Sequence, residues 1–371
     1  MSKTTKIGFV GCGSISGIYL ENITNMFKEI SIAGVCDLID ERAERASKQY
    51  GVRKYKDMYE LFADQEVDIV LNITRPYEHF DVTMAAIEAG KHVYSEKPLG
   101  ATFEEGQTIL AAAGAKGVLI AGAPDTFLGA GIQTCRKLID DGCIGTPVAA
   151  SAFMVCRGHE TWHPDPEFYY KYGGGPMLDM GPYYITALVN LLGPVQSLTG
   201  MSGISYPKRL ITSEPHNGEI ISVDVPTNIN GIMRFRSGAI GTIYTTFDVY
   251  RANVPLMEIY GSEGTLSVPD PNYFGGPVKL FRPEKGEFLE MPLMFEYAEN
   301  NRGLGLAEMA KSIELGRKPR ATSDLTSHVL EVITGFNKSS AEGKHIELAT
   351  KPERPAPMPM RTMSGRRGYI E

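Results

Sequence analysis

The first third of the chain alternates short apolar runs with longer amphipathic or polar segments. Runs such as "KIGFV" (residues 6–10) and "VDIVLNIT" (residues 67–74) are almost wholly apolar, which is typical of parallel strands covered on both faces. The segments between them have helical lengths, and Gly51 follows one of them in the position of a C-terminal cap. "TFEE" at residues 102–105 fits a capping box that opens another helix. The five predicted strands cover residues 6–10, 31–37, 67–74, 91–97 and 118–123. Strict alternation of strand and helix predicts an α/β domain with a doubly wound parallel sheet.

The pattern changes at about residue 149. One helix is predicted over residues 179–192, and several runs that alternate polar and apolar residues follow it. These runs are "GIMRFRSG", "AIGTIYTTFDVY", "LMEIYGSEG" and "TLSVPD". Such alternation favours a mainly antiparallel sheet with one open face, and two further helices make this part an α+β domain. We therefore expect domains at residues 1–146 and 147–345, followed by an extended proline-rich tail at residues 346–371.

Composition is that of a globular enzyme and excludes several other classes. The chain has 371 residues, 43% hydrophobic and 22% charged, with a net charge of −7 and scattered basic residues, which argues against a nucleic-acid partner. A basic cluster at residues 364–368 fits a solvated tail. No apolar run approaches the length of about 18 residues that a membrane span needs, and no signal segment precedes the first strand. The five cysteines lack CxxC spacing, which favours free thiols in a cytoplasmic protein. They are Cys12, Cys36, Cys135, Cys143 and Cys156.

A glycine-rich turn joins the first predicted strand to the first helix. Gly11, Gly13 and Gly17 form GxGxxxG, which differs from GxGxxG because Ser16 holds the sixth place. Between a strand and a helix this spacing is typical of the Rossmann fold, where backbone amides approach a pyrophosphate at the positive end of the helix. A tight turn without a ligand is the alternative. The predicted cofactor contacts here are Gly11, Cys12, Gly13, Ser14 and Ile15.

Polar residues follow the next predicted strands. Asp37 stands 20 residues after Gly17, where a carboxylate accepts hydrogen bonds from the adenosine ribose and repels a 2′-phosphate, so it favours NAD over NADP. A charge at a helix N-terminus is the alternative role. Ligands bind beyond the carboxyl ends of strands in open α/β sheets, so four further side chains are expected at the cofactor. These are Thr74, Arg75, Glu96 and Lys97. His79 either contacts the cofactor or packs its helix.

Three segments together resemble the Gfo/Idh/MocA family of nicotinamide-dependent sugar and polyol oxidoreductases. They are "GFVGCGSISG", "AGKHVYSEKPLG" and "GGGPMLDMG". The resemblance implies that Lys97 contacts the substrate hydroxyl and assists proton transfer, and that Asp179 is a substrate residue. It also implies a homodimer or homotetramer assembled through the open face of the C-terminal sheet, since an uncovered apolar sheet face would be an exposed patch.

The chain departs from the family motif after its glycines. Tyr183 takes the place of the usual histidine, as in the glucose–fructose oxidoreductase branch, and Thr186 takes the place of a further acidic residue. Tyrosine has an ordinary pKa of about 10, but a neighbouring ammonium and a cationic nicotinamide ring both favour the phenolate. Lys97 and Tyr183 are therefore a chemically sufficient pair, and the sequence does not decide which takes the proton. On one helix Asp179 and Tyr183 would share a face, and Tyr184 would pack. The alternative is a glycine loop before an ordinary amphipathic helix.

Residues 156–175 combine aromatic and polar side chains in a pattern that suits a sugar with apolar faces and a hydroxyl rim. The candidate substrate contacts are Arg157, His159, Trp162 and His163. His159, His163 and Asp165 are an alternative metal-binding set. A four-residue spacing brings two histidines to one face only on a helix, and this segment is a loop bounded by prolines, so no metal is expected.

These observations predict an NAD-dependent dehydrogenase that oxidises a secondary hydroxyl of a sugar, inositol or glycoside. Two other functions remain open. One is an enzyme that keeps NAD bound, oxidises a glycoside transiently and eliminates its substituent. The other is a non-catalytic dinucleotide-binding regulator, although the intact lysine motif counts against it.

Overall fold

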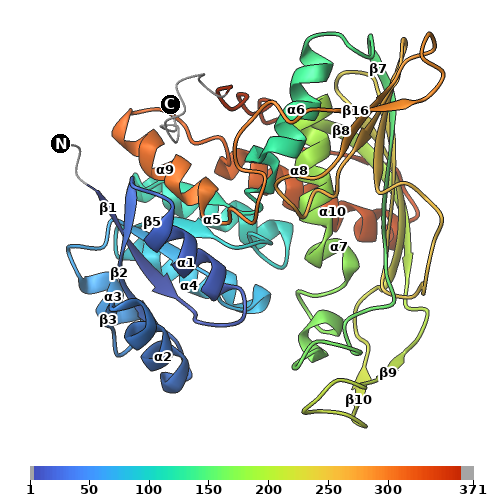
Figure 1. Cartoon of the computed structure of the whole chain (residues 1–371). Coiled ribbons are helices and arrows are strands. Elements are labelled where there is room, and N and C mark those ends of the chain that lie inside the picture. The colour runs from blue at the N-terminus through green and yellow to red at the C-terminus, as the bar shows by residue number, and fades with distance from the viewer. Residues whose placement is uncertain (1–3, 361–371) are drawn as a thin grey trace. The chain divides into compact units, whose positions relative to one another are not determined.

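The computed structural model describes residues 4–360, and within it the chain forms two compact units (Figure 1). Unit 1 contains the described residues up to Leu128 together with Asn300–Ser327, and unit 2 contains Gly129–Glu299 and His328–Met360. Asn300–Ser327, which the linear division expected from the sequence places in the second domain, therefore belongs to unit 1.

Unit 1 is built on a six-stranded parallel sheet in the order β3-β2-β1-β4-β5-β6. The strands are β1 (Thr5–Val10), β2 (Ile30–Cys36), β3 (Arg53–Lys54), β4 (Ile69–Asn72), β5 (His92–Ser95) and β6 (Ile120–Gly122). All four residues of β4 are buried, as expected for a parallel strand covered on both faces. The predicted doubly wound sheet is confirmed, with a short edge strand, β3, that the sequence pattern did not indicate.

Helices follow the strands of unit 1 in the expected alternation. They are α1 (Ser16–Asn25), α2 (Asp40–Tyr50), α3 (Met58–Ala63), α4 (His79–Glu88) and α5 (Phe103–Lys116), with the 3-10 turns η1 (Pro76–Glu78) and η2 (Thr126–Leu128). Gly51 adopts φ 66° after α2, which confirms the predicted C-cap. The Thr102 side chain accepts a hydrogen bond from Glu105 N, as the capping box predicts. The Glu105 carboxylate, however, accepts its hydrogen bond from Ala101 N.

Helix α9 (Leu304–Glu314) returns to unit 1 from the far end of the chain and lies beside its blue and cyan elements in Figure 1. Asp125, just after β6, accepts hydrogen bonds from Gly303 N (2.9 Å) and Gly305 N (3.0 Å) at the start of α9. A buried carboxylate therefore binds amides that the helix itself leaves unpaired.

Unit 2 is built on a nine-stranded sheet in the order β16-β15-β14-β13-β7-β12-β11-β8-β17, in which only β7 and β12 run parallel. Its strands are β7 (Pro147–Val155), β8 (Val195–Gly203), β11 (Asn228–Phe235), β12 (Ile240–Thr246), β13 (Met257–Gly261), β14 (Thr265–Val268), β15 (Val278–Phe281), β16 (Phe288–Met291) and β17 (Ile346–Glu347). Strands β9 (Lys208–Leu210) and β10 (Ile220–Ser222) form a separate hairpin. The predicted mainly antiparallel sheet is confirmed.

One face of this sheet is covered by helices and the other is open. The helices of unit 2 are α6 (Ala130–Asp140), α7 (Pro176–Asp179), α8 (Gly181–Leu192) and all but the first residues of α10 (Ser323–Glu342). Phe336 of α10 is fully buried and lies over Gly200 of β8 and Gly231 of β11, where a Cβ would meet the ring at 3.0 and 2.2 Å. The alternating burial of β11 and β12 confirms one covered and one open face.

The division between the units falls at residues 128–129 instead of near residue 146. Helix α6 belongs to unit 2 because Gly129 and Gly131 let its start approach the backbone of Phe274 and Gly275 too closely for any side chain. Residues 346–360 of the expected tail are packed on unit 2. Arg354 donates to the carbonyl oxygens of Asn190 and Leu191 at the end of α8, where a cation is favourable. The basic cluster at residues 364–368 lies outside the described residues.

Within residues 4–360, no helix combines the length and the hydropathy that crossing a membrane requires.

Candidate functional site

The glycine-rich turn begins directly after β1. One of its glycines is required by the surrounding protein atoms, and another is not. Gly11 has φ +108°, and a Cβ there would lie 2.6 Å from the carbonyl oxygen of Ile73, so only glycine fits. Gly13 has no such requirement, because a Cβ there would meet nothing within 4 Å. The neighbouring protein atoms thus leave open space over Gly13, where a ligand can approach the backbone.

The N-terminus of α1 is equipped to receive an anion. No side chain caps it at Ile15, and no acidic residue stands in its first turn, whereas α2 carries Asp40 and Glu41 there. Ser14 and Ile15 are exposed just before the helix. Unpaired amides and the helix dipole favour a phosphate group at this position.

Asp37 closes the same turn from the end of β2. Its carboxylate accepts hydrogen bonds from Cys12 N (2.6 Å) and Ile39 N (2.8 Å), so the strand end and the glycine turn are tied together. Burial and the neighbouring Asp37 carboxylate raise the pKa of Cys12 to about 12, which makes this thiol a packing residue without nucleophilic character.

These residues fit a dinucleotide. The open backbone at Gly13 and the uncapped α1 N-terminus suit a pyrophosphate, and a carboxylate held at the end of β2 suits ribose hydroxyls. The residues directly after Asp37 are Leu38 and Ile39, and the cations that act on this turn, Arg42 and Arg45, come from the following helix, α2.

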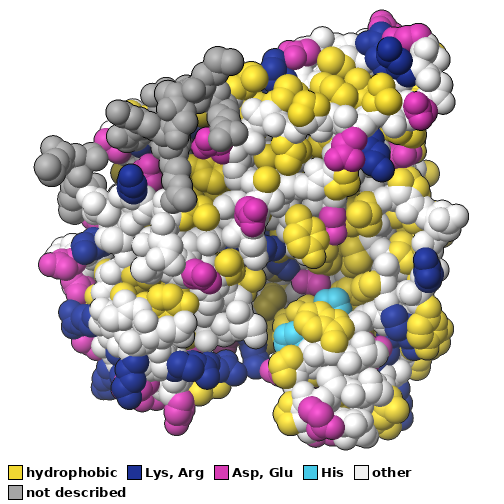
Figure 2. All heavy atoms as spheres, viewed as in Figure 1, with side chains coloured by type: hydrophobic (Ala, Val, Ile, Leu, Met, Phe, Trp, Pro, Cys, Tyr) yellow, Lys and Arg dark blue, Asp and Glu magenta, His cyan; other side chains and the backbone are white. Residues whose placement is uncertain are grey.

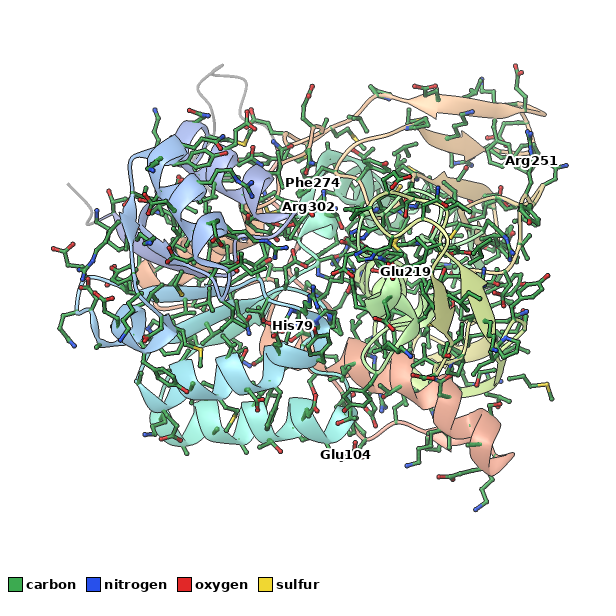
Figure 3. All side chains as sticks on the ribbon, turned by 90° about the horizontal axis from the view of Figure 1, so that it is seen from below. His79, Glu104, Glu219, Arg251, Phe274 and Arg302 are labelled. Atoms are coloured by element: carbon green, nitrogen blue, oxygen red, sulfur yellow. The ribbon has the colours of Figure 1, made fainter. Side chains whose placement is uncertain are left out.

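The end of β4 supplies the next predicted contacts. Thr74 Oγ1 donates to the buried Asn72 Oδ1 (2.8 Å), and Arg75 Nη1 donates to Tyr77 Oη (2.8 Å). His79, labelled at the start of α4 in Figure 3, is fully buried, with Nδ1 2.7 Å from Pro98 O and Nε2 3.2 Å from Thr74 O. Burial lowers the pKa of this imidazole. This geometry favours packing, one of the two roles left open by the sequence, because both ring nitrogens face protein carbonyls.

The end of β5 carries Glu96 and Lys97. The Glu96 carboxylate is buried and accepts hydrogen bonds from Tyr19 Oη (2.6 Å) and Lys97 N (3.0 Å). Tyr19 lies on α1, so the helix that begins at the glycine turn also fixes the backbone of the candidate catalytic lysine. The Lys97 side chain is half-buried.

In unit 2 the helix predicted over about residues 179–192 is confirmed as α8, but Asp179 lies before its first residue. Two helices meet at Met180: α7 ends at Asp179, and α8 begins at Gly181. A Cβ on Gly181 would lie 2.7 Å from Met177 Sδ, so α8 starts in tight contact with α7. Asp179 and Tyr183 therefore lie on consecutive helices instead of one continuous face. Tyr184 is 1% exposed and confirmed as a packing residue.

The glycines before α7 have a packing reason within unit 2. A Cβ on Gly174 would lie 2.5 Å from Phe168 O, and Gly175 has φ +90° with Pro226 O 2.9 Å from its Cβ position. These two positions let the chain pass directly over η3 (Glu167–Tyr170) on its way to Asp179.

The aromatic segment before these glycines brings three of the four candidate substrate residues together. The His159 ring lies 5.2 Å from that of Trp162, and Trp162 lies 5.4 Å from His163. The Trp162 side chain is 61% exposed. Figure 2 shows histidine and hydrophobic side chains together at the surface of this part of unit 2. Arg157 lies apart, with its guanidinium 4.8 and 4.6 Å from the ring centroids of Tyr206 and Tyr250.

His159 also reaches Asp179, with Nε2 3.3 Å from Oδ2, and both side chains are largely buried. This contact joins a residue predicted to bind substrate to one predicted to be catalytic. Within unit 1 the structure likewise brings Asp37 to Cys12 and Glu96 to Lys97.

Several supporting residues gave no sequence signal. These are Tyr19, Asn72 and the buried Glu160–Arg209–Asp248 cluster. Their partners are 7 to 77 positions away in the sequence, the longest separation being that between Tyr19 and Glu96. No spacing rule connects such residues. Among residues 4–360, no group of three His, Cys, Asp or Glu residues is placed to hold a metal ion.

Two models of one protein family match the chain. The model for the oxidoreductase family with an NAD-binding Rossmann fold matches residues 5–122, and the model for the GFO/IDH/MocA C-terminal domain matches residues 132–267. Together they cover more than half of the chain.

Similar proteins are inositol and sugar dehydrogenases. The myo-inositol 2-dehydrogenase of Thermotoga maritima is 23% identical over 92% of this chain and 98% of its own length. The inositol 2-dehydrogenase/D-chiro-inositol 3-dehydrogenase of Lactiplantibacillus plantarum is 31% identical, but over only 40% of this chain and 43% of that enzyme. The structure of a levoglucosan dehydrogenase complexed with NADH and levoglucosan matches with a TM-score of 0.78 at 19% identity, over 94% of this chain and 100% of that one.

The site residues, the fold of both units and the family models agree: the chain belongs to the Gfo/Idh/MocA family of oxidoreductases and carries the family's NAD-binding Rossmann domain.

Proposed function

We propose that this oxidoreductase oxidises a secondary hydroxyl on the ring of an inositol, sugar or glycoside and uses NAD as the hydride acceptor. The observation that carries the proposal is the cofactor end of unit 1, where Asp37 holds the glycine turn beside an uncapped helix N-terminus. The substrate class rests on the inositol and levoglucosan dehydrogenases to which the chain is similar.

We assign the cofactor contacts to the turn and to the strand ends of unit 1. Backbone amides of the turn would bind the pyrophosphate, and Asp37 would accept hydrogen bonds from the adenosine ribose. Glu96, fixed by Tyr19, would hold its segment against the nicotinamide half. The assigned residues are Gly11, Cys12, Gly13, Ser14, Ile15, Asp37, Thr74, Arg75, Glu96 and Lys97.

The reaction needs a proton acceptor and an orienting group from the protein. NAD, when bound, supplies the ring carbon that accepts hydride. Lys97 and Tyr183 together take the hydroxyl proton: the ammonium stabilises a developing phenolate or alkoxide, and either group passes the proton on. Asp179 accepts a hydrogen bond from a substrate hydroxyl and fixes which carbon is presented.

Aromatic and cationic side chains of unit 2 define the rest of the substrate site. Trp162 offers an exposed ring face for the apolar face of a sugar, and His163 lies against its edge. Arg157 is held between two tyrosine rings and presents donors for a hydroxyl rim. We assign His159 to the same site.

The open sheet face of unit 2 supports self-association into a dimer or tetramer. Met201, Ile232 and Ile240 are 78%, 55% and 43% exposed on β8, β11 and β12. An exposed apolar surface of this kind favours burial against another copy. The free thiols of all five cysteines fit a cytoplasmic location.

The direct test follows NADH formation with purified protein, NAD and a panel of inositols, aldoses and anhydrosugars. One compound or class should give NADH, and Lys97→Ala should reduce kcat by about 10²–10⁴-fold while NAD binding persists. Tight NAD binding without NADH release, together with cleavage of a glycoside, would instead indicate the enzyme that retains its cofactor. NAD binding without any turnover would indicate a regulator.

A further inference from the structure

His159 lies in the segment between β7 and η3, next to the end of α7. Its Nε2 is 3.3 Å from Asp179 Oδ2, and the two side chains are 12% and 14% exposed. Both residues belong to unit 2, so the contact is internal to one compact body. Hydrogen bonds that matter in catalysis are often this long before substrate arrives.

Among the described residues, the ring of His159 makes one polar contact, to Asp179. Three aromatic rings surround it, with centroids at 4.0 Å (Tyr169), 4.7 Å (Phe247) and 5.2 Å (Trp162). Its Nδ1 is buried and has no hydrogen-bond partner among the described residues. An N–H on Nδ1 would be left unsatisfied, so the tautomer that carries the proton on Nε2 fits this environment. That proton points to the Asp179 carboxylate.

The backbone of His159 is held by a buried network of polar side chains. His159 N donates to Tyr170 Oη (3.2 Å), and Tyr170 Oη donates to the Glu160 carboxylate. Glu160 is bound by Arg209 (2.9 Å), which also pairs with Asp248. Glu160, Arg209 and Asp248 are each at least 90% buried, so this cluster holds the segment that contains His159 in a fixed position.

We propose that His159 is a positioning residue for Asp179: it donates from Nε2 to one carboxylate oxygen, orients the carboxylate and favours its ionised form. The inference rests on the proposed function, in which Asp179 orients the sugar. Position 183 on α8 is a tyrosine in this chain. In this proposal the imidazole near Asp179 comes instead from His159, which lies in a separate segment.

Two further titratable groups act on Asp179 from the surrounding segments of unit 2. Cys156 lies at the end of β7, and burial raises the pKa of its thiol to about 11, so it stays neutral near pH 7. His163 follows in the aromatic segment, where burial lowers the pKa of its imidazole. Near neutral pH these two groups contribute little charge, so the test removes the His159 donor specifically.

The test compares His159→Phe, which keeps the ring packing and removes the donor, with His159→Gln, which places an amide N–H at a similar reach. With the substrate found in the panel, His159→Phe should lower kcat by up to about 100-fold, the cost of a misplaced catalytic group. The acidic limb of the pH profile of kcat should move to higher pH in His159→Phe, because Asp179 loses a donor that favours its ionised form. His159→Gln should recover most of kcat. The matched control is His345→Phe, which alters a half-exposed histidine at the start of β17.

A second readout needs no substrate or cofactor. The carboxyl ¹³C resonance of Asp179, assigned with Asp179→Asn, should titrate at higher pH in His159→Phe than in the wild type and return toward the wild-type value in His159→Gln. Unchanged titration and unchanged kcat in His159→Phe would overturn the inference. If the wild type oxidises none of the compounds, the proposed function fails, and this titration still decides whether His159 controls Asp179.

Discussion

Asp37 links the cofactor preference to the local fold of the glycine turn. One of its oxygens binds the Cys12 amide and the other binds the Ile39 amide, so the carboxylate is held at the end of β2 before any ligand arrives. A preorganised acceptor loses little entropy when ribose hydroxyls bind, and its charge repels a 2′-phosphate.

We therefore expect Asp37→Ser to change cofactor choice. The variant should lower kcat/KM for NAD by about 10–100-fold, since one bidentate acceptor is lost, and should raise the relative use of NADP. Steady-state rates with both cofactors measure the ratio. Asp40→Ser, which removes an exposed carboxylate paired with Lys54, is the control and should leave the ratio unchanged. An unaltered ratio in Asp37→Ser would show that another group selects the cofactor.

At the scale of elements, the approach to Asp179 depends on glycine. A Cβ on Gly174 would press on the backbone of Phe168 and Tyr169 at 2.5–2.7 Å. Tyr169 packs on His159, so any shift here reaches the candidate site.

Gly174→Ala should destabilise the protein by about 1–3 kcal/mol, the usual cost of overpacking against a fixed backbone. Gly203→Ala in β8 is the matched control, because a Cβ there meets nothing within 4 Å; it should change stability by less than about 0.5 kcal/mol. Thermal unfolding of both variants measures the difference. Equal stabilities would mean that the turn relaxes without cost.

The attachment of α9 predicts a dependence of stability on pH. Burial raises the pKa of Asp125 to about 6 in the folded state, above the ordinary value of about 3.9. The folded protein thus holds this proton more tightly than the unfolded chain. The stability that Asp125 contributes is complete below about pH 4 and is lost as pH rises through about 6.

Asp125→Asn keeps an oxygen acceptor for the two α9 amides and removes this titration. Between pH 5 and pH 7.5 the wild type should lose stability relative to the variant, by about 1.4 kcal/mol. Chemical denaturation at a series of pH values measures the two curves. Parallel curves would show that Asp125 stays ionised throughout.

The elements that sequence pattern predicted well are those whose signal is local. Apolar runs identified β1, β2, β4, β5 and β6 of unit 1 and the helices between them except α3, and alternation identified β11 to β14. The break between α7 and α8 was missed because four-residue spacing is the same whether or not Met180 interrupts the helix. Pro182 accounts for the break: it has no amide N–H to donate to Leu178 O, so a new helix begins around it, in the first turn of α8. The His159–Asp179 contact was missed because it joins two separate segments, although both residues were singled out.

At the scale of the whole molecule, the order of segments along the chain does not show which unit each segment belongs to. Asn300–Ser327 joins the cofactor-binding unit through Asp125, and α6 joins the other unit through Gly129 and Gly131. Both attachments depend on long-range contacts that no periodicity reports. The family resemblance, by contrast, was evident from three short motifs and is confirmed by models that match both units.

Assembly through the open sheet face gives a prediction at this scale. Ile232 lies at the centre of that face, with Thr199 of β8 and Thr242 of β12 opposite it. Ile232→Glu should shift the protein toward monomer in light scattering coupled to size-exclusion chromatography, because a buried unpaired carboxylate is costly. Gln49→Glu, at an exposed position of α2 in unit 1, controls for added charge. A wild-type monomer, or an oligomer that Ile232→Glu leaves intact, would contradict this assembly.

The most direct test of the account follows the hydrogen itself. A substrate from the panel, deuterated at its ring carbons, is incubated with the protein and NAD, and the released nucleotide is examined by mass spectrometry. The account predicts reduced cofactor carrying one deuterium, formed in step with the oxidised product and lost in Lys97→Ala. Product formed without deuterium in free nucleotide would contradict net hydride transfer to NAD.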